Sequence, residues 1–373
     1  MDVVQVGKFF YPYMGGIENH LYVLARELGP SVELDVVVSH TSPRTVREVV
    51  DGVSVTRCGT LGKLASTPIS PGMVLELSKR AYDVVHVHLP NPMGAASYLA
   101  SHKRRRHRLV VTYHSDIVRQ RRLNALYGPL VERLLSRADV VLATSQGLLD
   151  ASPVLAKFRE KSRVVPYGID LAQFERTPER LAAARDLRAR YGGRPILLAV
   201  GRLIYYKGFE HAIRALAQVP DAELVIIGDG PLKGELESLA RSLGVAERVH
   251  LLGDVHNQVI APHFLAADLY LLPSIAVSEA FGIVQIEAMA SGIPVINTRL
   301  ASGVPFVSRD GETGFTVEPA DAGALASAVR RLLEDTALRT RFGEAGRLRA
   351  EREFSREVLA RRLLAIYRGD SAA

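Results

Sequence analysis

The chain has 373 residues, and apolar residues make up 47% of them, which is enough to bury a core in each of two domains of ordinary size. The single cysteine, Cys58, excludes an intramolecular disulfide and a zinc ribbon, and it suits a reducing compartment. The first residues lack the features of a signal peptide, and no apolar run approaches the roughly 18 residues that span a bilayer. We therefore expect a cytoplasmic protein that contacts a membrane peripherally at most.

The net charge of +7 lies mostly in the first half of the chain. Residues 1–175 carry 22 Lys and Arg against 16 Asp and Glu, and the cations gather at 103–108 and 119–122. Such segments suit an anionic lipid, an anionic substrate or a nucleic acid, and they also suit a solvated helix end and loop. Because no nucleic-acid-binding motif accompanies the charge, we expect no nucleic-acid partner.

Short apolar runs alternate with helical patterns along the first half of the chain. This alternation predicts parallel strands joined by helices, and the continuous apolar character of the runs predicts strands covered on both faces. The strands are expected at 3–6, 34–38, 53–57, 84–87, 109–112 and 140–143, and the helices at 17–28, 94–102 and 123–136.

The alternation pauses at 166–195 and then starts again. Strands are expected at 196–200, 224–227, 249–251, 269–272 and 295–297, with helices at 209–217, 232–243 and 282–291, and three further helices at 321–333, 337–353 and 355–367. We therefore predict an α/β protein with two doubly wound domains. The predicted bounds are 1–167 and 168–353, followed by a C-terminal helix within 354–373.

The segment 278–287 is the first candidate for chemistry. Glu279 and Glu287 flank an almost wholly apolar stretch, so a helix that begins near residues 281–282 places the first acid in a loop and the second inside the helix. Ser278 could cap that helix. A glutamate in an apolar helix needs a partner, because burying it alone is costly. A ribose diol is one such partner and a basic side chain is another; two incidental acids on a buried helix are the alternative.

Two cations and several glycines follow strands in the way that anion-binding loops do. Arg202 and Lys207 come directly after the predicted strand 196–200 and could clamp an anion, or be solvated in a surface loop. Gly15 and Gly16 follow the first strand and open a helix, which lets backbone N–H groups approach a ligand. Gly230 lies in a Gly-Asp-Gly-Pro turn that departs from the dinucleotide fingerprint, because Lys233 stands where a third glycine is needed.

Histidines mark the ends of two predicted strands. His114 ends the strand 109–112 and is well placed for a cleft. His86 and His88 share one strand face, but no third metal ligand is apparent, so we expect structural or cleft-lining roles and no metal site. The chain has no Asp-x-Asp, the usual bridge between a metal and a diphosphate, which favours charge neutralisation by Arg202 and Lys207.

Several segments together resemble the retaining family-four glycosyltransferases of the GT-B fold, over nearly the whole chain. The most specific is the E-x7-E signature from Glu279 to Glu287, within SEAFGIVQIEAMASGIPV. The others occur in the family's order: GGIENHLYVLARELG, VVHVHLPNP, VVPYGID, GRLIYYKGFEHAI, IIGDGPL and DGETGFTVEP. The resemblance implies two Rossmann-like domains that face each other across a cleft, with the final helix returning to the N-terminal, acceptor-side domain.

The resemblance also implies a role for each motif in binding a nucleotide-sugar donor. Glu287 would bind the ribose hydroxyls, Glu279 the hydroxyls of the transferred sugar, and Arg202 with Lys207 would neutralise the departing diphosphate. His114 would contact the sugar near its anomeric carbon. The remaining donor contacts would come from Gly15, Gly16, Gly230, Phe281, Gly282 and Ile283. Transfer would proceed by a front-face displacement with retention, without a metal or other cofactor.

The segments HSDIVRQ, EAFGIVQIEAMASGIPVINT and SGVPFVS look most like those of enzymes that assemble bacterial surface polysaccharides and lipopolysaccharide. That resemblance implies a GDP-sugar donor, GDP-mannose first, and a glycan or lipid-linked acceptor. The segments 103–108 and 119–122 would then face anionic lipid on the inner side of the cell membrane, each cation adding about 1 kcal/mol. The alternatives are a GT-B sugar phosphorylase, a sugar-nucleotide epimerase, and a non-catalytic basic scaffold on a membrane.

Overall fold

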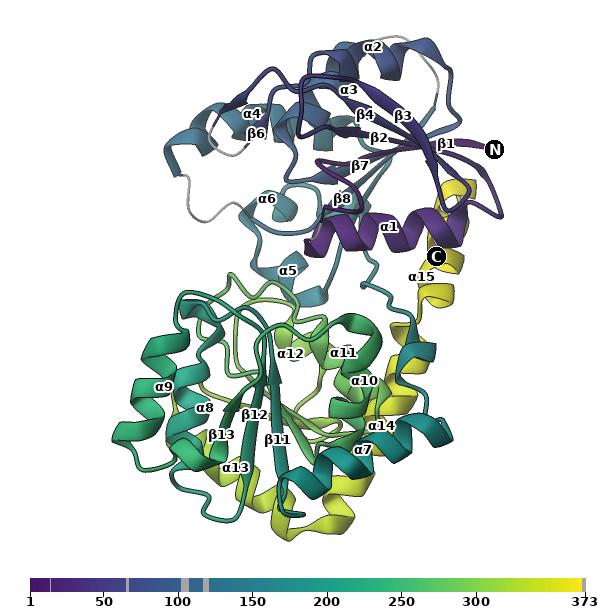
Figure 1. The fold of residues 1–373 in the computed structure, drawn as a ribbon. Helices are drawn as coiled ribbons and strands as arrows, with labels where there is room; N and C mark the ends of the chain where they lie inside the picture. The colour runs from purple at the N-terminus through teal and green to yellow at the C-terminus, as the bar shows by residue number, and fades with distance from the viewer. Residues whose placement is uncertain (14, 65–66, 102–106, 117–120, 371–373) are drawn as a thin grey trace. The chain divides into compact units, whose positions relative to one another are not determined.

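The computed structural model describes residues 1–13, 15–64, 67–101, 107–116 and 121–370 (Figure 1). The chain divides into two compact units. Unit 1 comprises Met1–Gly168 with Arg356–Ala373, and unit 2 comprises Ile169–Ser355. Each unit is an α/β domain built on a sheet of mainly parallel strands, so the predicted fold class of two Rossmann-like domains is confirmed.

The main sheet of unit 1 has eight strands within the described residues, in the order β10-β9-β8-β7-β1-β2-β4-β3. All neighbouring pairs are parallel except β3 with β4. The strands are β1 Asp2–Val6, β2 Glu33–Ser39, β3 Val46–Val50, β4 Val53–Cys58, β7 Val84–Leu89, β8 Arg108–Tyr113, β9 Val140–Ala143 and β10 Ser162–Val164. A separate hairpin joins β5 Lys63–Leu64 to β6 Thr67–Pro68.

Alternating side chains of this sheet enter two different apolar cores. Val3 and Val84 face α1 and α15, whereas Val4 and Val85 face α2, α3 and α4. The period-2 geometry of a strand explains why runs such as VVHV are apolar on both faces. The helices and helical turns of unit 1 are α1 Gly16–Leu28, α2 Gly72–Lys79, α3 Pro92–Ser101, α4 Arg121–Arg137, α5 Gln146–Ala151, α6 Pro153–Ala156, η1 Arg159–Lys161 and α15 Arg356–Arg368.

The C-terminal helix α15 belongs to unit 1, as predicted, and packs beside α1 (Figure 1). Leu359, Leu363 and Ile366 enter the core that α1 shares with the sheet. Phe354, however, lies in unit 2, where its ring contacts those of Phe281 and Phe306. The chain therefore leaves unit 2 after Ser355, two residues later than the sequence predicted.

Unit 2 has a six-stranded parallel sheet within the described residues, in the order β13-β12-β11-β14-β15-β16. The strands are β11 Ile196–Val200, β12 Glu223–Ile227, β13 Val249–Leu251, β14 Leu269–Leu271, β15 Val295–Thr298 and β16 Gly314–Val317. Successive strands run outward from β11 on one side and from β14 on the other. The neighbouring strands β11 and β14 therefore form a topological switch point, where α/β domains bind ligands at the carboxyl ends of their strands.

Helices cover both faces of the second sheet. α8, α9, α13 and α14 share an apolar core with one face, and α10 and α11 contact the strands from the other. The helices and helical turns are η2 Leu171–Phe174, α7 Pro178–Arg190, η3 Tyr205–Lys207, α8 Phe209–Leu216, α9 Lys233–Ser242, η4 Ala246–Arg248, α10 Asn257–Ala266, α11 Val284–Ala290, α12 Val304–Val307, α13 Ala322–Glu334 and α14 Thr336–Glu353.

The predicted ranges omit three helices of eight to thirteen residues, α2, α7 and α10. Other omitted elements are short or lie at an edge. β3 is an antiparallel edge strand whose first four residues are exposed, so it lacks the apolar run of a covered strand. β16 has four residues and lies at the edge of its sheet. α5, α6 and α12 have six residues or fewer, which is too few for a helical period to be recognised.

Candidate functional site

Two loops meet at the switch point of unit 2, one after β11 and one after β14. The Ile275 N–H donates a hydrogen bond of 2.8 Å to the Tyr206 carbonyl. Gly208 has φ +65°, and a β-carbon there would lie 2.1 Å from the Pro273 carbonyl oxygen. Only glycine fits this conformation and this contact, and so the two loops can approach closely enough for their side chains to pair.

The side chains that pair are Lys207 and Glu279. The Lys207 Nζ lies 2.7 Å from the Glu279 Oε2, and the two side chains are 11% and 10% exposed. The Ser274 hydroxyl donates a further hydrogen bond of 3.0 Å to the same carboxylate oxygen. The structure thus brings together two of the predicted site residues, and it shows that the charge of Lys207 is balanced by Glu279.

Arg202 supplies a second positive charge beside this pair. Its side chain is exposed, and no carboxylate among the described residues pairs with its guanidinium. Gly201 before it has φ +150°, and a β-carbon there would lie 3.1 Å from the Lys207 Nζ. The loop after β11 therefore presents one cation held by a carboxylate and one cation available to an anion, rather than two equivalent cations.

Glu287 lies in α11, which begins at the same end of the sheet. The residue is half-buried, and burial raises the pKa of its carboxyl group to about 7. No side chain in the described part of the chain pairs with that carboxylate or donates a hydrogen bond to it. A carboxylate in this environment favours a ligand that brings hydroxyl donors.

The start of α11 differs from the prediction. The helix begins at Val284 rather than near residues 281–282, and Ile283 rather than Ser278 occupies its N-cap position, without a side-chain cap. The reason is Gly282, whose φ of +72° lies outside the helical region, and where a β-carbon would lie 2.7 Å from the Leu272 Cδ2. Phe281 is buried and Ile283 is half-buried in this turn, so all three predicted backbone contacts lie in the segment that leads into the helix.

Gly230 also lies against the loop that carries Arg202. A β-carbon on Gly230 would be 2.5 Å from the Leu203 carbonyl oxygen, and the Leu203 N–H donates to the Asp229 carbonyl at 2.9 Å. The glycine is therefore required by the contact between two loops at the carboxyl ends of β11 and β12. Its predicted contact with the donor stays a prediction.

The predicted glycines of unit 1 lie at the start of α1. Gly15 is the N-cap residue in extended conformation, and a β-carbon there would lie 2.2 Å from the Glu18 Oε2. Gly16 has open space around its α-carbon. The carboxylate of Glu18 thus turns back toward the helix N-terminus, where it is favoured by the helix dipole. The predicted contact of these glycines with a diphosphate stays a prediction.

His114 is buried in unit 1, and both of its ring nitrogens have partners. The Nδ1 lies 2.6 Å from the Tyr167 hydroxyl, and the Nε2 lies 3.1 Å from the Nδ1 of His88. Burial lowers the pKa of His114 well below the usual value, so the ring is neutral. In this arrangement neither nitrogen is directed to solvent, and the predicted contact with a sugar requires the hydrogen bonds of the ring to rearrange.

Tyr270 lies beside the candidate site, and the sequence analysis did not single it out. Its side chain is fully buried in β14, and its hydroxyl points to the Val200 carbonyl at the end of β11, 3.5 Å away. Burial raises the pKa of Tyr270 well above its usual value, and the charges of Glu279 and Glu287 raise it further. The phenol therefore lies near both acids of the signature. In the sequence, Tyr270 is one of several hydrophobic residues in a predicted strand, and nothing in that pattern indicates a functional role.

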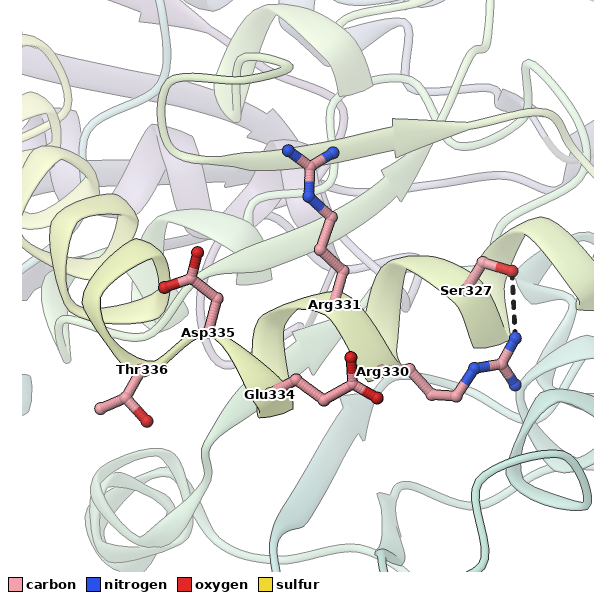
Figure 2. Close-up of a pocket in the computed structure, with 6 residues that line it drawn as sticks. All are labelled: Ser327, Arg330, Arg331, Glu334, Asp335 and Thr336. Atoms are coloured by element: carbon pink, nitrogen blue, oxygen red, sulfur yellow. Dashed lines mark hydrogen bonds between the residues drawn. The ribbon is translucent and has the colours of Figure 1, made fainter.

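A hollow of about 540 Å³ lies elsewhere in unit 2, where α13 meets α14 (Figure 2). Several of its polar groups already have structural partners: Arg330 bonds to Ser327, Arg331 lies over the Phe315 ring, and Asp335 caps α14. None of the predicted site residues lines it. We therefore assign the candidate site to the switch point.

The predicted basic segments fall largely outside the described residues, which omit 102–106 and 117–120. Their predicted contact with anionic lipid thus stays a prediction. Among the helices of the described residues, none combines the length and apolar character that crossing a bilayer requires.

The model of the Glycosyltransferase Family 4 matches residues 14–173, and that of Glycosyl transferases group 1 matches residues 183–349. The chain is 32% identical over 361 residues to O-antigen chain mannosyltransferase C of Escherichia coli, covering 95% of each chain. It is 34% identical to D-rhamnosyltransferase WbpZ of Pseudomonas aeruginosa, covering 89% of this chain and 87% of that one. It is 30% identical to a GDP-mannose-dependent alpha-(1-6)-phosphatidylinositol monomannoside mannosyltransferase of Mycolicibacterium smegmatis, covering 91% of each.

A solved structure of sucrose-phosphate synthase from Thermosynechococcus elongatus shares the fold, with a TM-score of 0.79, 26% identity and 99% coverage of each chain. The E-x7-E signature, the two Rossmann-like units and these full-length similarities agree with one another. The chain therefore belongs to glycosyltransferase family 4, with the GT-B fold, and is a glycosyltransferase.

Proposed function

We propose that this glycosyltransferase moves a hexose from a nucleoside-diphosphate sugar to a glycan or lipid-linked acceptor, with retention of anomeric configuration. GDP-mannose is the first donor to test. The names of the Escherichia coli and Mycolicibacterium smegmatis relatives support mannose, and the latter name supports a GDP-sugar. The name of the O-antigen relative likewise supports a role in the biosynthesis of surface polysaccharide or lipopolysaccharide.

One observation carries this proposal. Arg202, Lys207, Glu279 and Glu287 come from the loops and the helix that follow β11 and β14, at the switch point of one sheet. This set of two acids and two cations suits an elongated ligand that has a diphosphate between two hydroxyl-bearing groups. Glu287 would accept hydrogen bonds from the ribose, and Glu279 from the transferred sugar, while Lys207 and Arg202 meet the diphosphate between them.

Charge stabilisation of the leaving group is the main chemical task that we assign to this site. As the bond to the anomeric carbon breaks, negative charge grows on the departing diphosphate. Arg202 would contribute a new ion pair at that moment, whereas Lys207 would divide its hydrogen bonds between Glu279 and the phosphate. This proposal needs no metal at the donor, and so addition of Mg²⁺ or Mn²⁺ is expected to leave the transfer rate unchanged.

A thermal-shift screen of the purified chain against GDP-, UDP-, ADP- and dTDP-sugars tests the donor. A donor at 100 times its dissociation constant adds about 2.7 kcal/mol of stability, which is readily seen as a rise in Tm. Glu287→Ala should abolish the shift by the best donor. Glu235→Ala, at an exposed position of α9, is the matched control and should retain it.

A shift with a UDP-sugar and none with GDP-mannose would overturn the donor assignment but not the site. An unchanged shift in Glu287→Ala would overturn the ribose contact. Transfer itself is measured with the preferred donor and lipid-linked acceptors, and the configuration of the product at its anomeric carbon decides between retention and inversion.

We also propose peripheral contact with anionic membrane through 103–108 and 119–122. Neutralising Arg104, Arg105 and Arg106 should reduce binding to vesicles that contain anionic lipid, and should leave transfer to a soluble acceptor unchanged. Loss of both vesicle binding and transfer would instead indicate that these residues are needed for folding or for the active site.

A further inference from the structure

A layer of buried polar side chains lies between the sheet of unit 1 and the helices α1 and α15. His20 comes from α1, His88 from β7 and His114 from the end of β8, and their exposed fractions are 6%, 1% and 2%. Strand register explains how the last two meet, because His88 pairs with Thr112 and the His114 N–H donates to the Leu89 carbonyl. Three imidazoles therefore converge within this buried layer.

From this convergence we propose that His20, His88 and His114 form a binding site for a divalent transition-metal ion, with Zn²⁺ as the best match. One ligand nitrogen from each ring lies within 4.8 Å of the others. The Nδ1 of His88 and the Nε2 of His114 are 3.1 Å apart, close to the roughly 3.3 Å that separates two nitrogens at Zn–N distances of about 2.0–2.1 Å. The two nitrogens that are farthest apart must therefore close by at most about 1.5 Å to reach this spacing.

The orientation and protonation of the rings suit metal binding. The ring of His20 stands nearly perpendicular to those of His88 and His114, at 70° and 79°, and its centroid lies 5.9 Å and 5.3 Å from theirs. Burial lowers the pKa of His20 to about 3 and those of the other two rings well below the usual value. All three rings are therefore neutral, which is the form that binds a metal.

An unpaired nitrogen of His20 gives a second, independent reason. The Nδ1 of His20 is buried and has no hydrogen-bond partner within the described residues. The Nε2 of His88 is also unpaired, but it is not the nitrogen of His88 that faces His114. A buried polar atom without a partner is unfavourable, so such atoms usually serve a ligand or a bridging water. On His114 the Tyr167 hydroxyl, 2.6 Å from Nδ1, would hold the ring with Nε2 toward the ion, as outer partners of metal-bound histidines do.

The ligand set indicates which metals to expect. Three imidazoles without a thiolate suit Zn²⁺, Co²⁺, Ni²⁺ or Cu²⁺ rather than Mg²⁺ or Ca²⁺, which prefer oxygen ligands. This site lies in unit 1 and is distinct from the diphosphate-binding residues proposed in unit 2. It includes His114, for which the family resemblance implies a contact with the sugar. Metal binding can be measured without any transfer reaction, so either proposal can fail while the other stands.

His86 provides a matched control within the same layer. It lies two residues from His88 on the same strand face, and its ring centroid is 4.2 Å from that of His88. Both of its ring nitrogens are already hydrogen-bonded, to the Tyr367 hydroxyl and to the Thr112 hydroxyl, each at 2.7 Å. It is equally buried, so a substitution there perturbs the core to a similar degree without removing a proposed ligand.

The experiment uses the full chain, free of any affinity tag and treated with a chelator, and adds Co²⁺ as a spectroscopic probe. We expect one equivalent to bind with the visible absorption of four-coordinate cobalt, and Zn²⁺ to displace it. His20→Asn and His88→Asn should each weaken Co²⁺ binding at least tenfold, whereas His86→Asn should leave it within about twofold. Circular dichroism of the metal-free variants checks that each is folded.

Absence of Co²⁺ binding to the folded wild-type chain would overturn the proposal, and so would equal binding by wild type and His20→Asn. If one variant fails to fold, Zn²⁺ should still raise the Tm of the wild-type chain and of His86→Asn. A Tm that Zn²⁺ leaves unchanged would assign the unpaired nitrogens to internal water instead.

Discussion

Lys207 and Glu279 lie 2.7 Å apart although they follow different strands, β11 and β14, whose loops meet at the switch point of unit 2. Both side chains are about nine-tenths buried, so each charge depends on the other for compensation. A loop-to-loop ion pair of this kind fixes the relative position of two segments that the reaction requires together. The ion pair is therefore expected to contribute both to the stability of the fold and to the geometry of the candidate site.

Breaking this pair should destabilise the protein. Lys207→Met and Glu279→Gln should each lower the free energy of unfolding by about 3 kcal/mol, because each leaves its partner buried and unpaired. The double variant should lose less than the sum of the two, which urea denaturation measures. Glu351→Gln, which breaks an exposed pair with Arg347 on α14, is the control and should cost at most about 0.5 kcal/mol. Additive losses at Lys207 and Glu279 would show that the pair is not coupled.

Donor binding should depend on pH through Glu287. Hydroxyl groups of a ribose donate to the ionised carboxylate and favour it, whereas the carboxyl group of the free protein has a pKa of about 7. We therefore expect the dissociation constant of the donor to be about tenfold lower at pH 8 than at pH 6. In Glu287→Gln this dependence should disappear. Calorimetry at pH 6 and pH 8 measures donor affinity for the wild type and for the variant. A wild-type affinity that does not change between these pH values would contradict the assignment of Glu287 to the ribose.

The raised pKa of Glu287 also predicts how the stability of the donor-free protein changes with pH. Its folded pKa is raised from 4.5 to about 7, so the native state holds a proton that the unfolded chain has released, and the free energy of unfolding falls as pH rises between these values. Glu287→Gln should thus be more stable than wild type at pH 8, by on the order of 1–3 kcal/mol, and the difference should shrink at pH 5. Thermal melts without donor test this sign.

Arg202 should matter more for the rate of transfer than for donor binding. Its guanidinium has no carboxylate partner in the described part of the protein and is exposed, so its removal leaves the fold intact. We expect Arg202→Ala to lower kcat about 100-fold while donor affinity changes less than threefold, and the double variant with Lys207→Ala to be slower still. Arg214→Ala, at an exposed position of α8, is the control. A large loss of donor affinity with little change in kcat would instead indicate that Arg202 binds the donor without stabilising the transition state.

Gly282 should tolerate no side chain. Its φ of +72° disfavours any other residue, and a β-carbon would lie 2.7 Å from the Leu272 Cδ2 and 2.8 Å from the Gln285 Nε2. We expect Gly282→Ala to lower the free energy of unfolding by about 2 kcal/mol and to weaken donor binding, because the turn before α11 shifts. Gly234→Ala in α9, where space is open, should instead be neutral or stabilising. Equal Tm values for the two variants would show that the turn at Gly282 accommodates a side chain without loss of stability.

The prediction of the site from the sequence was partial for identifiable reasons. The E-x7-E spacing and the cations after the strand 196–200 located the segments that meet at the switch point. The helix start was placed about two residues early, because Gly282 has a left-handed φ of +72° that the pattern of residues does not reveal. The pairing of Lys207 with Glu279 and the position of Tyr270 near two acids depend on how β11 and β14 lie side by side.

The amino-acid sequence by itself determined the alternation of strands and helices, the division into two domains and the family. Continuous apolar runs and turn residues are local, and they specify covered parallel strands whatever their neighbours. Only the tertiary structure decided which distant side chains meet. The sequence offered His86 and His88 as a pair without a third ligand, and the fold instead joins His88 to His20 and His114. Strand order and helix packing bring those rings together, and no local period in the chain encodes such a contact.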